Sequence, residues 1–252
     1  MKFVLIMKVE KKAEIIKNWI KDYCKNISFK PKSLIVGISG GIDSTVVSTL
    51  CALTGMKTIV LSMPIKQIQT QHDLSLKHGE WLKNKFNNVE FKLIEMEKIF
   101  ISFKDVLNDF GNEHGLANSR ARLRMSVLYQ VAASNTGIVV GTGNKVEDFG
   151  VGFYTKYGDG GVDISPIADC NKSDVWELGK HLGVLKEIIE AKPTDGLWND
   201  GRNDEDQLGM TYEELEKAMS NTNDPNYKKY LEIRKKNLHK MNPIPVCKFD
   251  DV

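Results

Sequence analysis

The fold is decided by the stretch Leu34-Ile35-Val36-Gly37-Ile38-Ser39-Gly40-Gly41-Ile42-Asp43-Ser44-Thr45-Val46-Val47. An apolar run leads into a serine, two adjacent glycines, an aspartate and a second serine, and a helical apolar pattern then begins. This order predicts a buried strand, a tight turn and the N-terminus of a helix. Glycine lets an anion approach the main chain closely, and the free N–H groups of the helix face that anion. The segment Gly37–Ser44 therefore predicts a phosphate cradle, with an ordinary glycine-rich turn as the alternative.

This cradle differs from the common P-loop, in which a lysine precedes the hydroxyl residue. Here Asp43 stands directly before Ser44, and a carboxylate in that place suits a metal ion. A strand followed by Ser-Gly-Gly-x-Asp-Ser resembles the pyrophosphate loop of the N-type ATP pyrophosphatases. The resemblance implies that ATP is cleaved between its α- and β-phosphates and that AMP is transferred to a substrate oxygen.

The composition is that of an ordinary globular protein, with 41% hydrophobic and 27% charged residues among 252. The net charge of +2 gives no indication of a broad nucleic-acid-binding surface. No apolar run is long enough for a membrane span or a signal-peptide core. The four cysteines form no C-x-x-C pair, so neither a zinc site nor a disulfide framework is indicated. We therefore expect a cytoplasmic protein without nucleic-acid or membrane partners.

Strands alternate with helices over the first 141 residues. The expected strands are Leu34–Ile38, Lys57–Met63, Val89–Ile94 and Gly137–Gly141. The expected helices are residues 8–25, 42–53, Thr70–Phe86, Lys98–Phe110, Leu116–Ser134, Ser173–Leu182, Thr211–Met219 and Tyr227–Lys240. This pattern predicts an α/β fold, a doubly wound, Rossmann-like parallel sheet with helices on both faces, as a single domain over residues 1–252. The acidic segment Pro193–Gly209 has few bulky apolar residues, so we expect a mobile loop beside the active site.

Two carboxylates are candidate ligands for a metal ion. In a doubly wound sheet the tips of the first and fourth strands face the same crevice. Glu147 follows the fourth strand by six residues, and Asp43 follows the first. Both give hard oxygen ligands, so they could share one Mg²⁺ with the phosphates of ATP. The alternative, that Glu147 is a surface carboxylate, is equally compatible with the spacing.

Two further stretches carry unusual residues. Arg120, Arg122 and Arg124 alternate along a predicted helix, where Arg120 and Arg124 share one face. They form either a solvated basic face or a bidentate grip on a carboxylate or phosphate. The segment Phe153–Asp163 combines glycines, aromatic residues, a lysine and two aspartates. It is either a turn-rich loop or a flat-walled pocket that stacks a base or a pyridine ring.

Four motifs together resemble the NAD⁺ synthetases. They are the cradle, Gly141-Thr142-Gly143-Asn144-Lys145-x-Glu147, Phe153-Tyr154-Thr155-Lys156-Tyr157-Gly158-Asp159-Gly160-Gly161 and Lys192-Pro193-Thr194. The likeness extends over essentially the whole chain. It departs from the family in one extra residue between Glu147 and Thr155, and in Asp195 after Thr194, so Asp148–Gly152 receive no roles.

The resemblance also implies roles for individual residues. ATP binding is implied for Gly37, Ile38, Ser39, Gly40, Gly41, Ile42, Asp43, Ser44, Thr142, Lys172 and Thr194. Of these, Asp43, Lys172 and Thr194 are the implied catalytic residues, while Asp43 and Glu147 match the Mg²⁺ ligands. Binding of deamido-NAD⁺ (nicotinic acid adenine dinucleotide) is implied for Arg122, Lys156, Asp163, His239 and Lys240.

The activity implied is the amidation of deamido-NAD⁺ by ammonia, with ATP cleaved to AMP and pyrophosphate through an adenylated carboxylate. The chain begins almost directly with the first synthetase helix, so we expect free ammonia rather than glutamine as the nitrogen donor. The family resemblance also implies a homodimer, with the helix Leu116–Ser134 as the candidate interface. The alternatives are another adenylating amidotransferase, such as a GMP-synthetase-like enzyme, or a non-catalytic nucleotide-binding protein. Retention of both Asp43 and Glu147 argues against the last.

Overall fold

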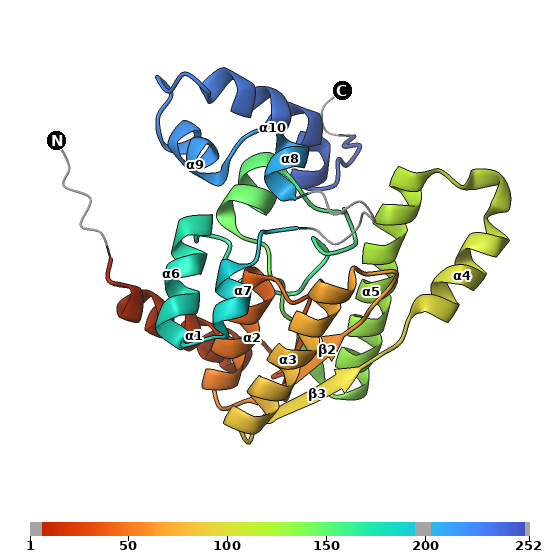
Figure 1. The fold of residues 1–252 in the computed structure, drawn as a ribbon, viewed down its shortest axis with the longest axis vertical. Helices are drawn as coiled ribbons and strands as arrows, with labels where there is room; N and C mark the ends of the chain where they lie inside the picture. Colours follow the sequence, from red (N-terminus) through yellow and green to blue (C-terminus); the bar gives the residue numbers. More distant parts are fainter. Residues whose placement is uncertain (1–6, 195–202, 250–252) are drawn as a thin grey trace.

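The computed structural model describes residues 7–194 and 203–249. Within these residues, four parallel strands form one sheet in the order β3-β2-β1-β4 (Figure 1). The strands are β1 (Ser33–Gly37), β2 (Lys57–Ser62), β3 (Val89–Leu93) and β4 (Gly137–Val139). The chain winds from β1 through β2 to β3 on one side and returns to place β4 on the other. A crevice between the carboxyl ends of β1 and β4 is where such sheets bind ligands, so the sheet places the cradle at the switch point.

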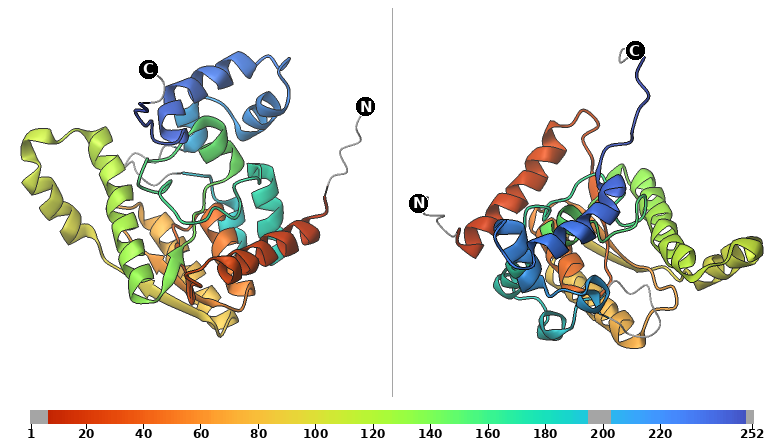
Figure 2. Two further views of the ribbon diagram at one scale, coloured as in Figure 1. Left: turned by 180° about the vertical axis from the view of Figure 1, so that it is seen from behind. Right: turned by 90° about the horizontal axis from the view of Figure 1, so that it is seen from above.

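Helices cover both faces of the sheet, which confirms the predicted doubly wound architecture (Figure 2). Along β1, Leu34 and Val36 face one layer, whereas Ile35 faces the other. The first layer contains α1 (Val9–Asn26), α2 (Ile42–Leu53), α3 (Gln69–Lys85), α6 (Lys172–Leu182) and α7 (Lys186–Glu190). The second contains α4 (Glu97–Val106) and α5 (Glu113–Ser134).

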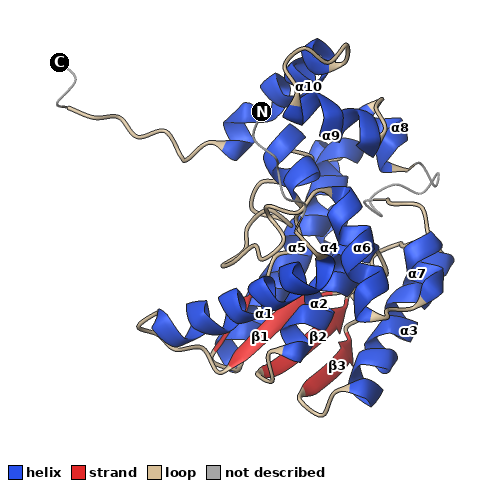
Figure 3. Cartoon of the chain, turned by 90° about the vertical axis from the view of Figure 1, so that its left-hand side faces the viewer, coloured by secondary structure: helices blue, strands red, loops and turns tan. Residues whose placement is uncertain are grey.

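The C-terminal helices form a cap with its own apolar cluster, seen in blue in Figure 1 and at the top of Figure 3. Its elements are η2 (Lys145–Val151), α8 (Asp204–Leu208), α9 (Tyr212–Ser220) and α10 (Tyr227–Met241). Leu215 and Val146 are fully buried in this cluster, so α9 packs directly on η2. After α10, residues 242–249 run as an extended tail (Figure 3). Among the described residues, no helix is both long and apolar enough to cross a membrane.

Two expectations about the connecting segments need correction, and a third stays a prediction. The helix expected over Lys98–Phe110 ends at Val106, and a 3₁₀ turn, η1 (Asn108–Phe110), follows it. Of the expected mobile loop Pro193–Gly209, residues 195–202 lie outside the described residues, so that expectation stays a prediction there. Over its last part the expected loop is wrong, because residues 204–208 form helix α8, and mobility there stays a prediction. A reciprocal capping box between Asn203 and Asp206 starts this helix, and Gly209 with φ 68° ends it.

One buried histidine gives the fold a pH dependence. His78 on α3 is fully buried against α2, and its Nε2 lies 2.8 Å from the hydroxyl of Ser48. Burial lowers the pKa of His78 to about 3, so the imidazole is neutral in the folded protein. An unfolded histidine has a pKa near 6.5, so between pH 6.5 and pH 3 it binds a proton that the buried imidazole does not bind. The contribution of His78 to the free energy of unfolding is therefore fully present above pH 6.5, and it is lost as the pH falls toward 3.

We expect the free energy of unfolding to fall by about 2 kcal/mol between pH 7 and pH 5 because of His78 alone. Urea unfolding at the two pH values measures it. His78→Gln should remove this part of the pH dependence, whereas His181→Gln, an exposed position on α6, should leave it intact. An equal pH dependence in wild type and His78→Gln would show that the buried imidazole is not responsible.

Candidate active site

The cradle connects β1 to α2 through a turn held by its own serines. Gly40 has φ 86°, a conformation that residues with a side chain rarely adopt. The N–H of Ser39 donates to the hydroxyl of Ser44 at 3.2 Å, and the N–H of Gly41 donates to the hydroxyl of Ser39 at 3.2 Å. Gly41 is the N-cap of α2, and it makes no side-chain capping bond. The N–H groups of the first turn of α2 are therefore placed to bind an anion.

Gly40→Ala tests how tightly this turn is built. A Cβ on Gly40 would lie 2.6 Å from the carbonyl oxygen of Gln71 and 2.9 Å from the amide nitrogen of Ser75, both in the backbone of α3. We expect Gly40→Ala to lower the free energy of unfolding by about 2–4 kcal/mol and to abolish detectable ATP binding. Gly55→Ala is the matched control, because Gly55 also has a positive φ (79°) but meets nothing within 4 Å. Equal losses in the two variants in thermal melts and calorimetry would contradict this account.

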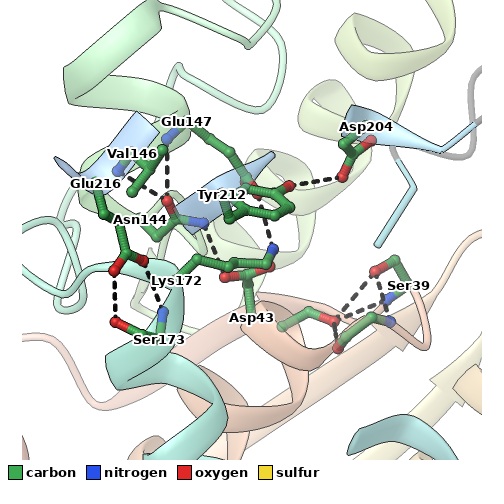
Figure 4. A network of polar contacts seen from close by, with 12 residues as sticks. Ser39, Asp43, Asn144, Val146, Glu147, Lys172, Ser173, Asp204, Tyr212 and Glu216 are labelled. Atoms are coloured by element: carbon green, nitrogen blue, oxygen red, sulfur yellow. Dashed lines mark hydrogen bonds and ion pairs between the residues drawn. The ribbon is translucent and has the colours of Figure 1, made fainter. Parts of the chain in front are cut away.

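A buried lysine lies at the centre of the site (Figure 4). Lys172 is the first residue of α6 and its side chain is only 1% exposed. Its ammonium donates to Oδ2 of Asp43 at 2.6 Å and to Oε1 of Glu147 at 2.8 Å. Burial alone would lower the pKa of Lys172, but the two carboxylates outweigh it and raise the pKa above its usual value. Residues from α2, η2 and α6, far apart in the sequence, thus meet at one charged centre.

Further polar groups orient the two carboxylates (Figure 4). The side-chain amide of Asn144 donates to Oδ1 of Asp43 at 3.0 Å, and its oxygen accepts from the N–H groups of Val146 and Glu147 at 3.0 Å each. The hydroxyl of Tyr212 on α9 donates to Oε1 of Glu147 at 2.5 Å. The same hydroxyl lies 3.1 Å from Oδ2 of Asp204. The C-terminal cap therefore takes part in building the site.

The donor set fits a hard divalent cation. Carboxylate oxygens of Asp43 and Glu147 both lie within hydrogen-bond distance of one atom, Lys172 Nζ, so they can approach a common ion. Among the described residues, no cluster of three or more histidine, cysteine, aspartate or glutamate side chains forms a fuller metal cage. Mg²⁺ is usually bound by one or two carboxylates, with substrate phosphates and water as the remaining ligands. Two carboxylates beside a phosphate cradle match this mode of Mg²⁺ coordination.

A cavity of about 260 Å³, which we call the cradle cavity, brings the expected ATP and metal residues together. It is lined by Gly37, Ile38, Ser39, Gly40, Gly41, Ile42, Asp43, Ser44, Thr142, Glu147, Lys172 and Thr194, among others. Every residue that the sequence indicated for ATP or Mg²⁺ therefore faces one space.

A second, adjoining cavity of about 730 Å³, which we call the outer cavity, contains three of the five expected dinucleotide residues. Arg122, Lys156 and Lys240 line it, and Met125 and Val162 line both cavities. The other two expected residues take part in different contacts. The carbonyl oxygen of His239 accepts from Lys156 Nζ at 3.4 Å. Asp163 accepts from the N–H of Val139 at 2.7 Å and from the hydroxyl of Tyr129 at 3.2 Å. It thereby joins the segment Phe153–Asp163 to β4 and α5.

The region after Glu147, where the sequence is expected to carry one residue more than the family pattern, begins in a π-helix. Residues Lys145–Val151 form the π-helical segment η2, and such segments are frequent at functional sites. Asp148 within it lines the cradle cavity against Gly143. Burial, and then the charges of Asp159, Glu147 and Asp43, raise the pKa of Asp148 well above its usual range. No role was expected for this carboxyl, because the sequence departs from the family pattern between Glu147 and Thr155.

The comparisons with known proteins agree with this geometry. The family model described as NAD synthase matches residues 12–246. An NH₃-dependent NAD⁺ synthetase of Archaeoglobus fulgidus is 34% identical over 256 residues, covering 98% of this chain and 100% of that protein. One of Methanococcoides burtonii is 40% identical over 190 residues, covering 73% of this chain and 70% of that protein.

Solved structures of similar proteins share the fold. An NMN synthetase from Francisella tularensis superposes with a TM-score of 0.89 at 31% identity, covering 96% of this chain and all of that one. An NH₃-dependent NAD synthetase from Campylobacter jejuni gives a TM-score of 0.77 at 27% identity with the same coverage. Because the family model spans most of the chain and relatives above 30% identity cover nearly all of it, the chain belongs to the NAD synthase family.

Proposed function

We propose that this protein amidates deamido-NAD⁺ with ammonia and cleaves ATP to AMP and pyrophosphate. The substrate carboxylate attacks the α-phosphorus of ATP, the bond to the bridging oxygen breaks, and pyrophosphate leaves with the electron pair. Ammonia then adds to the carbonyl of the acyl adenylate, loses a proton, and AMP departs. The curated relatives carry the name of this activity, and the cradle cavity has the residues that the chemistry needs.

The chain's own residues have separate tasks in this scheme. The N–H groups at the start of α2 and the ammonium of Lys172 stabilise the negative charge that develops on the departing pyrophosphate. Asp43 and Glu147 would hold Mg²⁺, which neutralises charge on the phosphate oxygens when it is bound. Asn144 and Tyr212 keep those two carboxylates oriented. Thr194 lines the same cavity and is proposed to contact the nucleotide.

One observation carries the proposal: the cradle cavity adjoins the outer cavity, and Met125 and Val162 line both. ATP in the first and the dinucleotide acid in the second would bring the α-phosphate and the nicotinate carboxylate together. The test supplies ATP, Mg²⁺, ammonium and deamido-NAD⁺ to the purified protein. NAD⁺, AMP and pyrophosphate should form in equal amounts and only when the acid is present. Formation of ADP and phosphate would contradict the proposal.

A second candidate substrate is the corresponding mononucleotide acid, which would give nicotinamide mononucleotide. The observation that favours it is the TM-score of 0.89 with the Francisella tularensis NMN synthetase, against 0.77 with the Campylobacter jejuni NAD synthetase. The chemistry at the cradle would be the same, and only the ligand in the outer cavity would be shorter. Comparing kcat/KM for the two acids in the same assay decides between them.

We further propose that the chain works as one domain and assembles as a homodimer. Support for one domain comes from Tyr212 of the cap, which contacts Glu147 at the site. Support for a dimer comes from the arm formed by α4, η1 and the start of α5, which projects from the body (Figures 1 and 2). On this arm Val106 is 83% exposed and Phe110 is 79% exposed. Apolar side chains gathered on a projecting arm are typical of an interface.

The dimer is tested by sedimentation at micromolar concentration. Wild type should sediment as a dimer, and the double substitution Val106→Glu, Phe110→Glu should shift it to a monomer. Glu97→Gln, which alters a charge on the same helix, is a control that should leave the dimer intact. A wild-type monomer with full activity would refute the assembly.

A further inference from the structure

Arg124 is a cation in the cradle cavity, and the sequence left two roles open for it, a solvated basic face or a grip on a carboxylate or phosphate. It lies on α5, one turn after Arg120, and lines the cavity together with Met125 and Leu128. Its Nε donates to the carbonyl oxygen of Met63, directly after β2, at 2.9 Å. Arg122, two residues earlier, is exposed and lines the outer cavity instead. The two arginines therefore line different cavities, and of the two alternatives the solvated basic face does not hold for Arg124.

The charge of Arg124 is poorly matched by the described residues around it. Nη2 of Arg124 is buried and has no hydrogen-bond partner. Among the described carboxylates, Asp159 attracts the guanidinium, but without a direct ion pair, while Arg120 repels it. Burial, and then Arg120, lower the pKa of Arg124 to about 10, which still leaves it charged at neutral pH. Lys172, in the same cavity, is by contrast paired with two carboxylates.

A structural role explains only part of this arrangement. A guanidinium has five N–H donors in a fixed fork, and the bond to Met63 uses only one of them. A buried cation that no described carboxylate pairs with directly lowers stability, so a purely structural tie would be better made by a neutral donor. The unmatched charge is understandable if an anionic ligand completes it, because the fork of arginine matches the planar edge of a carboxylate or two oxygens of a phosphate.

We propose that Arg124 binds an oxyanion of the reactants in the cradle cavity. The ligand is either a phosphate oxygen of ATP or the carboxylate that attacks the α-phosphorus, since both converge on this space. The inference rests on the proposed function for the identity of the ligands. It adds to that function a cation on the α5 wall, whereas Lys172 approaches from α6.

The test compares Arg124→Gln and Arg124→Lys with wild type by calorimetry. The probes are α,β-methylene-ATP with Mg²⁺, which cannot be cleaved between its α- and β-phosphorus atoms, and deamido-NAD⁺, each alone. Arg124→Gln should weaken binding of one probe by about 10- to 100-fold, the effect of losing a charge-assisted hydrogen bond. Arg124→Lys should recover only part of the loss, because it keeps the charge without the fork. The probe that is affected identifies the source of the oxyanion.

Arg122→Gln is the matched comparison on the same helix. It faces the outer cavity, so it should weaken binding of deamido-NAD⁺ and leave the ATP analogue at wild-type affinity. Melting of the ligand-free protein gives a second readout. Arg124→Gln removes an unmatched buried charge, so its ligand-free melting temperature should not fall, whereas loss of a structural tie would lower it.

The proposal is overturned if both probes bind the folded Arg124 variants within twofold of wild type. If Arg124→Gln fails to fold, Arg124→Lys alone decides, and unchanged affinity for both probes refutes the proposal. The proposed function fails separately, if wild type binds the ATP analogue but forms no NAD⁺ from the complete substrate mixture. The affinity of the folded Arg124 variants for the ATP analogue can be measured whether or not the wild-type protein forms NAD⁺.

Discussion

Lys172→Met is expected to lower kcat by at least about 10³-fold, the largest loss among the substitutions considered. The ammonium lies 2.6 Å from Asp43 and 2.8 Å from Glu147, so its removal leaves two facing carboxylates without a cation. It also removes one of the groups that stabilise the departing pyrophosphate, and losing one such group alone lowers turnover by about 10²–10³-fold. Breaking a buried ion pair should further lower the free energy of unfolding by about 3–5 kcal/mol.

Lys12→Met provides the matched control for this experiment. Lys12 on α1 forms an ion pair at 2.6 Å with Asp174, which lies on α6 just two residues after Lys172. That pair is partly solvated and lies outside both cavities, so its loss should lower the free energy of unfolding by no more than about 1 kcal/mol and leave kcat unchanged. Urea unfolding and steady-state kinetics on the two variants separate the effects. Similar kinetics in Lys172→Met and Lys12→Met would remove Lys172 from the mechanism.

Asp43→Asn and Glu147→Gln should each lower turnover by about 10²-fold or more and raise the Mg²⁺ concentration needed for half-maximal rate. Each change keeps the shape of the side chain and removes one negative charge. Asp169→Asn is the control, because Asp169 is 97% exposed and, among the described residues, forms an ion pair only with Lys145. Calorimetric binding of Mn²⁺ in the presence of α,β-methylene-ATP gives a readout independent of turnover. Near-wild-type activity at limiting Mg²⁺ would show that the substituted residue is not a ligand.

Sequence patterns predicted much of the fold because local signals and burial agree there. The run Leu34–Val36 is apolar on both faces, as a central parallel strand must be, and the glycines after it permit the tight turn before α2. The cradle and metal residues gathered as expected because the carboxyl ends of β1 and β4 are neighbours in a doubly wound sheet. Lys172 could be assigned by resemblance, but the distances that join it to Asp43 and Glu147 come only from tertiary structure.

What sequence patterns missed depends on contacts between distant segments. Tyr212 lies 65 positions after Glu147, and no local pattern joins the two. Asn144 belongs to a quoted motif, yet its bond to Asp43 spans 101 positions. Arg124 shares a predicted helix face with Arg120, but its guanidinium donates to the carbonyl oxygen of Met63, 61 positions earlier in the chain. Whether a charged side chain on a helix is buried therefore depends on the elements packed against it and not on helical spacing alone.

The most direct test of the central claim follows one oxygen atom. Deamido-NAD⁺ labelled with ¹⁸O in the nicotinate carboxylate is converted in the presence of ATP, Mg²⁺ and ammonium, and the products are analysed by mass spectrometry. If the carboxylate attacks the α-phosphorus, one labelled oxygen must appear in AMP and none in pyrophosphate. Label in inorganic phosphate together with ADP, or AMP without label, would contradict the adenylation mechanism that the cradle, Lys172 and the two carboxylates are proposed to perform.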